Sequence, residues 1–303
     1  MFPTFLPPTA QQLTEATSID LAQKIQQRAI ATSLSANPIL TTYVHQGEDL
    51  QREDTPPVLM LHGFDSSVME YRRLLPRLAQ HYETWAVDLL GFGLTQRPVD
   101  VSFSAADIKQ HLYATWKELI QQPVILVGAS MGGAAAMDFA ATYPDWVKAL
   151  ILLDSAGAGK GPNMGRFLIP PMGYLAAEFL RNPNVRKGIS KSAYSNKSLA
   201  TADAACCAAL HLASSDWSRA MIAFTRSGGY NVLTWQQIET IQAPTLILWG
   251  TQDQILGTAV ASQIEQHISS SKLIWIDDCG HVPHLEKPER VTQHIRSFLS
   301  QSL

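Results

Sequence analysis

Short apolar runs alternate with helical patterns along most of the chain, and this alternation limits the folds that the chain can adopt. Six runs of four or five residues are almost wholly apolar, which is typical of strands buried on both faces. Strand and helix in alternation predict a parallel sheet with right-handed crossovers and helices on both faces. The runs are Val58–Leu61, Thr84–Val87, Val124–Val127, Ala149–Leu153, Thr245–Trp249 and Leu273–Ile276, and the helical patterns are Tyr71–Gln80, Ala105–Ile120, Met131–Tyr143, Thr258–His267 and Glu289–Leu299.

Two segments depart from this alternation. Helical spacing from Ser18 to about Leu34 predicts an N-terminal helical extension over residues 1–41. The stretch between Asp154 and Pro244 is too long for a structureless loop, so it predicts an inserted helical cap over residues 156–241, with helices near Tyr174–Leu180 and Ala202–Leu212. The core then consists of residues 42–155 and 242–303.

Charge and composition exclude several classes of function. The chain has 303 residues and a net charge of -3, which disfavours a nucleic-acid partner because there is no basic excess to neutralise phosphates. Its three cysteines show neither metal-ligand spacing nor a disulfide framework, so we expect a reducing, cytoplasmic location. We expect no secretory signal, because the N-terminus lacks a basic region followed by an apolar stretch, and no run is long enough to span a membrane.

A serine between glycines follows directly after one predicted strand. Gly128-Ala129-Ser130-Met131-Gly132 stands between Val124–Val127 and a predicted helix, which is the sequence context of a nucleophile elbow. The turn needs small flanking residues, and the helix N-terminus favours a developing negative charge. Ser130 is therefore the candidate nucleophile.

A serine nucleophile needs a general base and an acid that orients the base. Asp253 follows the strand Thr245–Trp249, and His281 follows the strand that ends near Ile276. Both residues fall at the carboxyl ends of predicted parallel strands, where catalytic groups of such sheets gather. The order serine, acid, histidine is also that of α/β-hydrolases.

With these residues in view, the chain resembles an α/β-hydrolase-fold serine hydrolase with a helical cap after the sixth strand, from about Thr42 to the end. The resemblance implies Ser130 as nucleophile, His281 as general base and acid, and Asp253 as orienting acid, with no metal or cofactor. It also implies an oxyanion hole formed by the backbone N–H groups of Phe64 and Met131. One departure is Thr95, where serine is usual, and it affects loop packing rather than the triad. The motifs are 61–64 (LHGF), 88–93 (DLLGFG), 128–133 (GASMGG), 249–253 (WGTQD) and 280–288 (GHVPHLEKP).

Other residues compete for these roles. His62 stands in the HG loop, so we interpret it as a structural hydrogen-bonding residue. His284 lies three residues beyond His281, but the glycine before His281 matches the family pattern. Asp277 and Asp278 lie on or just after a strand rather than on the expected loop. Asp154 ends the sixth strand, where some relatives have the acid, and it stays as a second candidate.

The cap is basic, whereas the rest of the chain is acidic. Residues 156–241 contain nine Lys/Arg and four Asp/Glu, a net charge of +5, so the remainder has -8. Apolar residues near 167–180 lie beside clustered basic ones, which indicates either a lid that contacts an anionic membrane surface peripherally or a cap that packs its apolar face on the body. In both cases we expect an apolar pocket, with Phe167, Tyr174, Phe179 and Trp217 as its cap residues.

These features favour a serine hydrolase that acts through an acyl-enzyme. Its substrate would be a small-molecule, hydrophobic carboxylic ester with a large apolar part. A weaker resemblance is to the plastid and cyanobacterial branch of the family, including chlorophyll dephytylases, which cleave an isoprenoid ester. Carbon–carbon bond hydrolases of the same fold share the triad and stay as an alternative. A triad-bearing, receptor-like binding protein is a third hypothesis, which ligand-induced thermal stabilisation without product formation would distinguish.

Overall fold

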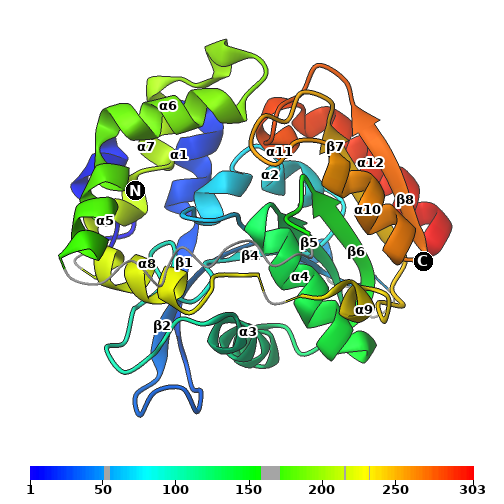
Figure 1. Cartoon of the computed structure of the whole chain (residues 1–303), viewed down its shortest axis with the longest axis horizontal. Helices are drawn as coiled ribbons and strands as arrows, with labels where there is room; N and C mark the ends of the chain where they lie inside the picture. Colours follow the sequence, from blue (N-terminus) through cyan, green and yellow to red (C-terminus); the bar gives the residue numbers. More distant parts are fainter. Residues whose placement is uncertain (51–54, 158–170, 215, 232) are drawn as a thin grey trace.

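The structure is a computed structural model, and one mostly parallel sheet forms its centre (Figure 1). Among the described residues the sheet has eight strands in the order β1-β2-β4-β3-β5-β6-β7-β8. Strand β2 pairs antiparallel with both β1 and β4, and the other neighbouring pairs are parallel. The described residues are 1–50, 55–157, 171–214, 216–231 and 233–303. The strands are β1 Ile25–Ile30, β2 Ile39–Gln46, β3 Val58–Leu61, β4 Thr84–Val87, β5 Val124–Ala129, β6 Val147–Leu153, β7 Thr245–Gly250 and β8 Ser271–Ile276.

Helices cover both faces of the sheet, as the sequence predicts. In β5, Val124 and Leu126 pack into one core, whereas Ile125 and Val127 pack into the other. The first core includes residues of α3, α4 and α10, and the second includes residues of α1, α2 and α12. All six predicted strands are present, so the α/β-hydrolase fold class is confirmed. The helices are α1 Ala16–Gln23, α2 Leu75–Leu78, α3 Ala105–Leu119, α4 Met131–Thr142, α10 Ala259–His267, α11 Pro283–Glu286 and α12 Pro288–Ser302.

The predicted helix over 18–34 is wrong beyond α1. Residues Ile25–Ile30 form β1, which pairs with β2 from Ile25 opposite Val44 to Ile30 opposite Ile39. The segment contains glutamine, arginine and alanine, which favour a helix locally, but pairing with a distant segment overrides that preference. The N-terminal extension is therefore only partly helical, and the expected boundary between residues 41 and 42 falls inside β2.

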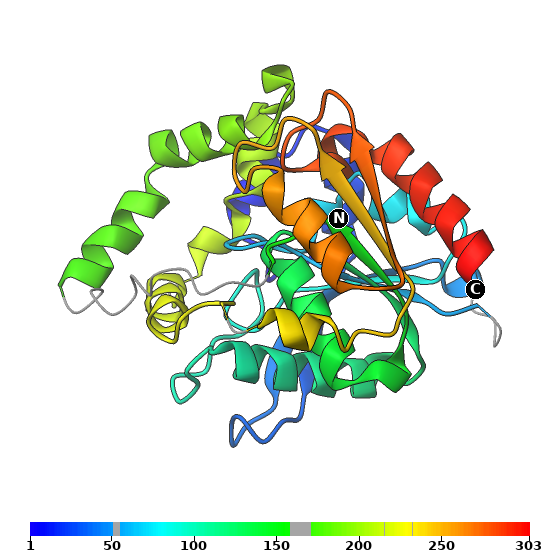
Figure 2. The same cartoon turned by 45° about the vertical axis from the view of Figure 1, so that its right-hand side comes forward.

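The segment between β6 and β7 forms a helical layer beside the carboxyl ends of the strands (Figures 1 and 2). The predicted helix near Tyr174–Leu180 is present as α5, and that near Ala202–Leu212 as α7 followed by a 3₁₀ turn. Phe167, one of the predicted pocket residues, lies outside the described residues. The described helices of the segment are α5 Met172–Arg181, α6 Pro183–Ala193, α7 Ala202–Cys207, α8 Trp217–Arg226 and α9 Trp235–Ile238. Among the described residues, no helix combines the length and apolar character needed to cross a bilayer.

Candidate active site

Ser130 occupies a strained turn between β5 and α4. Its φ of 51° and ψ of -120° lie in a region that non-glycine residues rarely adopt, and such strain is common at functional sites. The turn is held by a hydrogen bond of 3.0 Å from the Ser130 N–H to the carbonyl of Leu153. A Cβ atom at Gly128 would lie 2.3 Å from the Gly132 oxygen, so a larger residue does not fit there.

Asp253 and His281 come together in loops at the same edge of the sheet. His281 Nδ1 lies 2.9 Å from Asp253 Oδ2, and both residues are buried. The other carboxylate oxygen, Oδ1, accepts hydrogen bonds from the backbone N–H groups of Ile255 at 2.7 Å and Leu256 at 3.1 Å. Burial raises the pKa of Asp253, but the hydrogen bond and charge of His281 and these N–H groups lower it overall. Asp253 is therefore an ionised partner for the imidazole.

A second buried carboxyl group, that of Asp154, lies beside this pair. Its Oδ1 accepts a hydrogen bond of 3.0 Å from the Gly250 N–H, and its buried Oδ2 has no hydrogen-bond partner among the described residues. Burial, together with the charge of Asp253, raises the pKa of Asp154 well above its ordinary value. Because two neighbouring buried carboxylates repel each other, this arrangement favours the proton on Asp154 and the negative charge on Asp253.

Within the part of the chain that the structure describes, the same three groups also form a cluster that could hold a metal ion. Asp154, Asp253 and His281 each present a ligand atom, and these atoms lie within 4.8 Å of one another. However, Nδ1 of His281 already contacts Asp253 at 2.9 Å, and Asp154 favours its neutral form. This donor set suits a hydrogen-bonded relay better than a divalent cation, which needs deprotonated ligands.

Ser130 and His281 both line one cavity of about 440 Å³, which lies between the carboxyl ends of the strands and the cap. Phe64 is half-exposed and also lines the cavity. Among the described residues, the backbone N–H groups of Phe64 and Met131 donate no hydrogen bond to another protein group. Most of the lining is apolar and comes from both layers: Met69, Leu180, Ala193, Ala204, Ala208, Leu212, Ile255, Val282 and Leu285.

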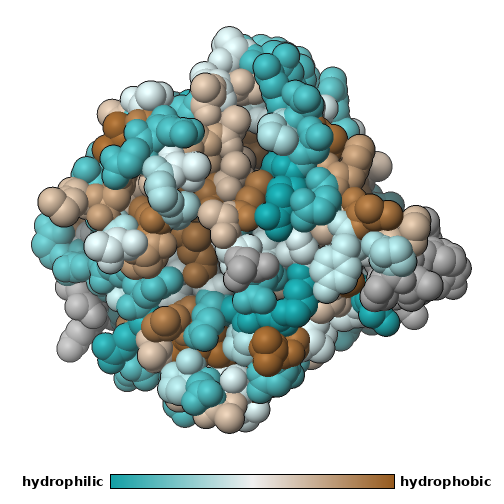
Figure 3. Space-filling view, turned by 90° about the vertical axis from the view of Figure 1, so that its left-hand side faces the viewer, coloured by the Kyte–Doolittle hydropathy of each residue, from teal (hydrophilic) through white to brown (hydrophobic). Residues whose placement is uncertain are grey.

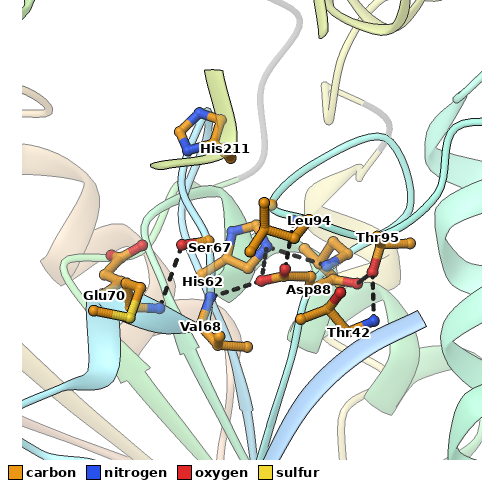
Figure 4. Close-up of polar contacts among 12 residues, drawn as sticks. Thr42, His62, Ser67, Val68, Glu70, Asp88, Leu94, Thr95 and His211 are labelled. Atoms are coloured by element: carbon orange, nitrogen blue, oxygen red, sulfur yellow. Dashed lines mark hydrogen bonds and ion pairs between the residues drawn. The ribbon is translucent and has the colours of Figure 1, made fainter. Parts of the chain in front are cut away.

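A buried polar network supports the loop that contains Phe64 (Figure 4). His62 Nε2 accepts a hydrogen bond of 3.1 Å from the Leu89 N–H, and burial lowers the pKa of His62 to about 4. The Asp88 carboxylate accepts hydrogen bonds from the N–H groups of Val68 and Leu94. Thr95 donates a hydrogen bond of 3.0 Å to the Asp88 carbonyl, so its hydroxyl stabilises the neighbouring loop of residues 88–95. His62 is thus a neutral structural residue.

Glu70 holds the adjacent backbone and the second histidine. It accepts a hydrogen bond of 2.8 Å from the Gly63 N–H, and its Oε1 lies 3.1 Å from His284 Nε2. Burial raises the pKa of Glu70, but the close contact with His284 and the charge of that histidine lower it overall, to about 2. His284 is thereby engaged away from Asp253. Sequence reasoning missed Glu70, because no short motif identifies a carboxylate whose partners are distant in the chain.

Asp65, also missed from the sequence, connects this loop to the cap. Its Oδ2 accepts two hydrogen bonds of 2.8 Å from Arg186, and its Oδ1 accepts hydrogen bonds from His211 at 2.9 Å and from the Trp217 indole at 2.8 Å. These three partners belong to three different parts of the cap. Asp65, the residue after Phe64, therefore joins this loop to three parts of the cap.

The predicted cap pocket residues need correction. Tyr174 and Phe179 are 50% and 64% exposed, because they lie on the solvent side of α5. Trp217 is buried, but its indole binds Asp65 rather than lining the cavity. Residues one position along the helix or in the next helices face the cavity instead, such as Leu180 and Leu212. Local helical spacing identifies an apolar face but does not say which neighbour that face contacts.

The sequence of this chain is similar to those of known proteins of one family. The sequence profile described as alpha/beta hydrolase fold matches residues 56–288. The chain belongs to the α/β-hydrolase family. Alpha/beta hydrolase domain-containing protein VTE7 of Arabidopsis thaliana is 32% identical over 306 residues, which cover 100% of this chain and 92% of VTE7. A plant relative agrees with the resemblance to the plastid and cyanobacterial branch.

Bacterial hydrolases are also similar to the chain. The 2-hydroxy-6-oxo-6-(2'-aminophenyl)hexa-2,4-dienoic acid hydrolase of Metapseudomonas resinovorans is 27% identical over 289 residues, which cover 93% of this chain and 94% of that enzyme. Among solved structures, a thermophilic esterase from Thermogutta terrifontis has a TM-score of 0.75 at 24% identity and covers 91% of this chain and 99% of the esterase. A meta-cleavage product hydrolase from Pseudomonas fluorescens has a TM-score of 0.74 at 21% identity, covering 91% and 98%. The structural likenesses show the fold, and the family is one of hydrolases.

Proposed function

We propose that this α/β-hydrolase cleaves a carboxylic ester with a large apolar part through an acyl-enzyme intermediate. The observation that supports the proposal is the opening of Ser130 and the Asp253-bound His281 into one largely apolar cavity. A cavity of about 440 Å³ lies within the range typical of small-molecule sites. An apolar lining stabilises a hydrophobic acyl or alcohol group by removing it from water.

In the proposed mechanism, Ser130 Oγ attacks the ester carbonyl carbon while its proton passes to His281 Nε2. The resulting oxyanion accepts hydrogen bonds from the N–H groups of Phe64 and Met131, which donate to no other described protein group. Ionised Asp253 holds Nδ1 of His281 and stabilises the imidazolium. The C–O bond then breaks, the alkoxide takes the proton from His281, and a water molecule hydrolyses the acyl-enzyme by the same steps.

Hydrolysis of p-nitrophenyl esters of increasing acyl length tests this proposal, with Ser130→Ala as the diagnostic variant. We expect turnover to rise with acyl length and the variant to lose roughly 10⁴-fold or more in kcat, as triad serine substitutions do. Ser190→Ala, which changes another serine of the cavity lining, is the matched control and should stay near wild type. A fluorophosphonate probe followed by mass spectrometry should place a single adduct on Ser130.

Each other outcome points elsewhere. Full activity in Ser130→Ala overturns the assignment of the nucleophile. An adduct on Ser130 without ester turnover favours another bond type, and neither adduct nor turnover favours a binding protein. Isoprenoid alcohol esters belong in the series because of the resemblance to the plastid branch.

Carbon–carbon bond hydrolysis is the second candidate, favoured by the sequence similarity to the dienoic acid hydrolase. Such substrates contain a carboxylate, and four basic residues line the cavity: Arg72, Arg181, Arg186 and Lys187. Incubation with a 2-hydroxy-6-oxo-dienoate, followed by its loss of absorbance, tests this activity directly. Faster turnover of the dienoate than of every ester would make carbon–carbon cleavage the primary reaction.

A further inference from the structure

Helix α5 of the cap presents its large apolar side chains to solvent. Met172, Leu175 and Phe179 stand at positions i, i+3 and i+7, so they share one side of the helix. They are 58%, 62% and 64% exposed, whereas Gly173 and Ala177 are the buried residues of the same helix. The usual arrangement buries the large apolar face of an amphipathic helix. Here the small residues face the protein and the large ones face outward.

Helix α6 extends this surface and adds positive charge. Ile189 is 50% exposed, and Lys187 and Lys191 on the same helix are also exposed. Residues 172–193 contain four basic residues and one acidic residue, Glu178. We call the surface formed by these exposed side chains the cap surface; its residues are Met172, Leu175, Phe179, Lys187, Ile189 and Lys191. Figure 3 looks onto this side of the molecule, where hydrophobic and hydrophilic side chains lie next to one another.

The cap surface reaches the mouth of the cavity that contains Ser130. Ile189 is both half-exposed and part of the cavity lining, and Lys187 beside it also lines the cavity. Figure 2 shows α5 and α6 as an arm that extends outward from the body. A flat partner on this arm would therefore lie next to the entrance of the apolar cavity.

We propose that the cap surface docks on an anionic lipid bilayer, with the α5 side chains inserted among the acyl chains and the lysines at the headgroups. Interspersed large apolar and basic side chains on an exposed helix are the signature of interfacial binding, because both the hydrophobic effect and the surface potential contribute. The charge distribution supports a lipid partner, since the cap has a net charge of +5 and the rest of the chain has -8. Repulsion of the acidic body then orients the molecule cap-first on the membrane. This proposal goes beyond the proposed reaction, because docking requires no turnover.

Flotation of the full chain with vesicles tests the proposal without any substrate. We expect binding to vesicles that contain phosphatidylglycerol, weaker binding to pure phosphatidylcholine, and loss of binding at high salt. The double variant Leu175→Ser/Phe179→Ser should lower the partition coefficient at least about tenfold, because it removes two insertable side chains. Lys191→Gln should lower it about fivefold, the usual contribution of one basic residue near an anionic surface.

Matched controls separate docking from general effects. Val99→Ser removes an 83% exposed apolar residue outside the cap, and Lys117→Gln removes an exposed charge on α3, so both should bind as wild type does. Hydrolysis of a water-soluble ester by the Leu175→Ser/Phe179→Ser variant should stay unchanged, which shows that it folds. Absence of vesicle binding by the wild type, or unchanged binding by the double variant, overturns the proposal. Concentration-dependent dimers in sedimentation velocity that the double variant abolishes would assign the surface to a second copy instead.

Discussion

Gly132 is the position where a single methyl group should disturb both stability and catalysis. A Cβ atom there would lie 2.0 Å from the Leu61 carbonyl oxygen and 2.5 Å from that of His62. Real Cβ atoms essentially never approach closer than 3.0 Å, so α4 and the end of β3 must separate by about 1 Å. We expect Gly132→Ala to cost about 3 kcal/mol or more, since both obstructing atoms are backbone. In a chain of this size that is a fall of roughly 6 °C in Tm.

The same separation moves Met131 away from the loop that leads to Phe64. Misplacement of about 1 Å in a catalytic constellation costs roughly 10²-fold, so kcat should fall by that order. Thermal unfolding and ester kinetics of the purified variant measure both effects. Gly188→Ala is the matched control: a Cβ there meets nothing within 4 Å on exposed α6, and it should stabilise by about 0.5–1 kcal/mol. A Gly132→Ala enzyme with wild-type Tm and kcat would refute the steric reasoning, and a lowered Tm with intact kcat would refute the link to the oxyanion hole.

Two further predictions concern buried titratable groups. Asp154→Asn should keep kcat within about threefold, because an amide replaces the protonated carboxyl group beside Asp253, whereas a loss near 10⁴-fold would make Asp154 the orienting acid. Burial lowers the pKa of His111 to about 4 from 6.5, so the unfolded chain takes up a proton first as the pH falls. The contribution of neutral His111 to the free energy of unfolding is fully present above pH 6.5. It is lost as the pH falls from 6.5 to 4, and the loss is about 3 kcal/mol in all. Urea unfolding at pH 7 and pH 4 measures the free energy of unfolding of the wild type and of His111→Gln. Between these pH values the variant should lose about 3 kcal/mol less than the wild type does. An equal loss in both proteins would contradict the role given to His111.

Strand β1, at one edge of the sheet, shows where prediction of strands from the local sequence pattern fails. Strands β3, β4, β5, β6 and β7 are predictable because each is buried on both faces and therefore almost wholly apolar, whereas β8, at the opposite edge of the sheet, is apolar over Leu273–Ile276 although only Ile276 is buried. Strand β1 buries only Ile25 and Ile30, so its sequence contains no such run. Its conformation depends on hydrogen bonds to β2, a partner that begins nine residues beyond its end. The helical spacing of the apolar residues in this segment therefore predicted a helix where the structure has a strand.

The cap shows the same limit at the level of side chains. Apolar spacing along 174–180 predicts a helix, and α5 is that helix. Which side of it faces the cavity is set by the packing of neighbouring helices, so Leu180 lines the cavity while Phe179 points to solvent. The sequence pattern is the same in either case.

The sequence by itself determined the fold class and pointed to Ser130, Asp253 and His281, because a serine between glycines after an apolar run marks a nucleophile elbow, and the order serine, acid, histidine is that of α/β-hydrolases. Only the tertiary structure decided how the site is supported. Asp65, Glu70 and Asp154 obtain their partners from segments far apart in sequence, and burial among those partners sets which of them is charged. Local spacing contains no information about such contacts, since their energies arise only when the chain is folded.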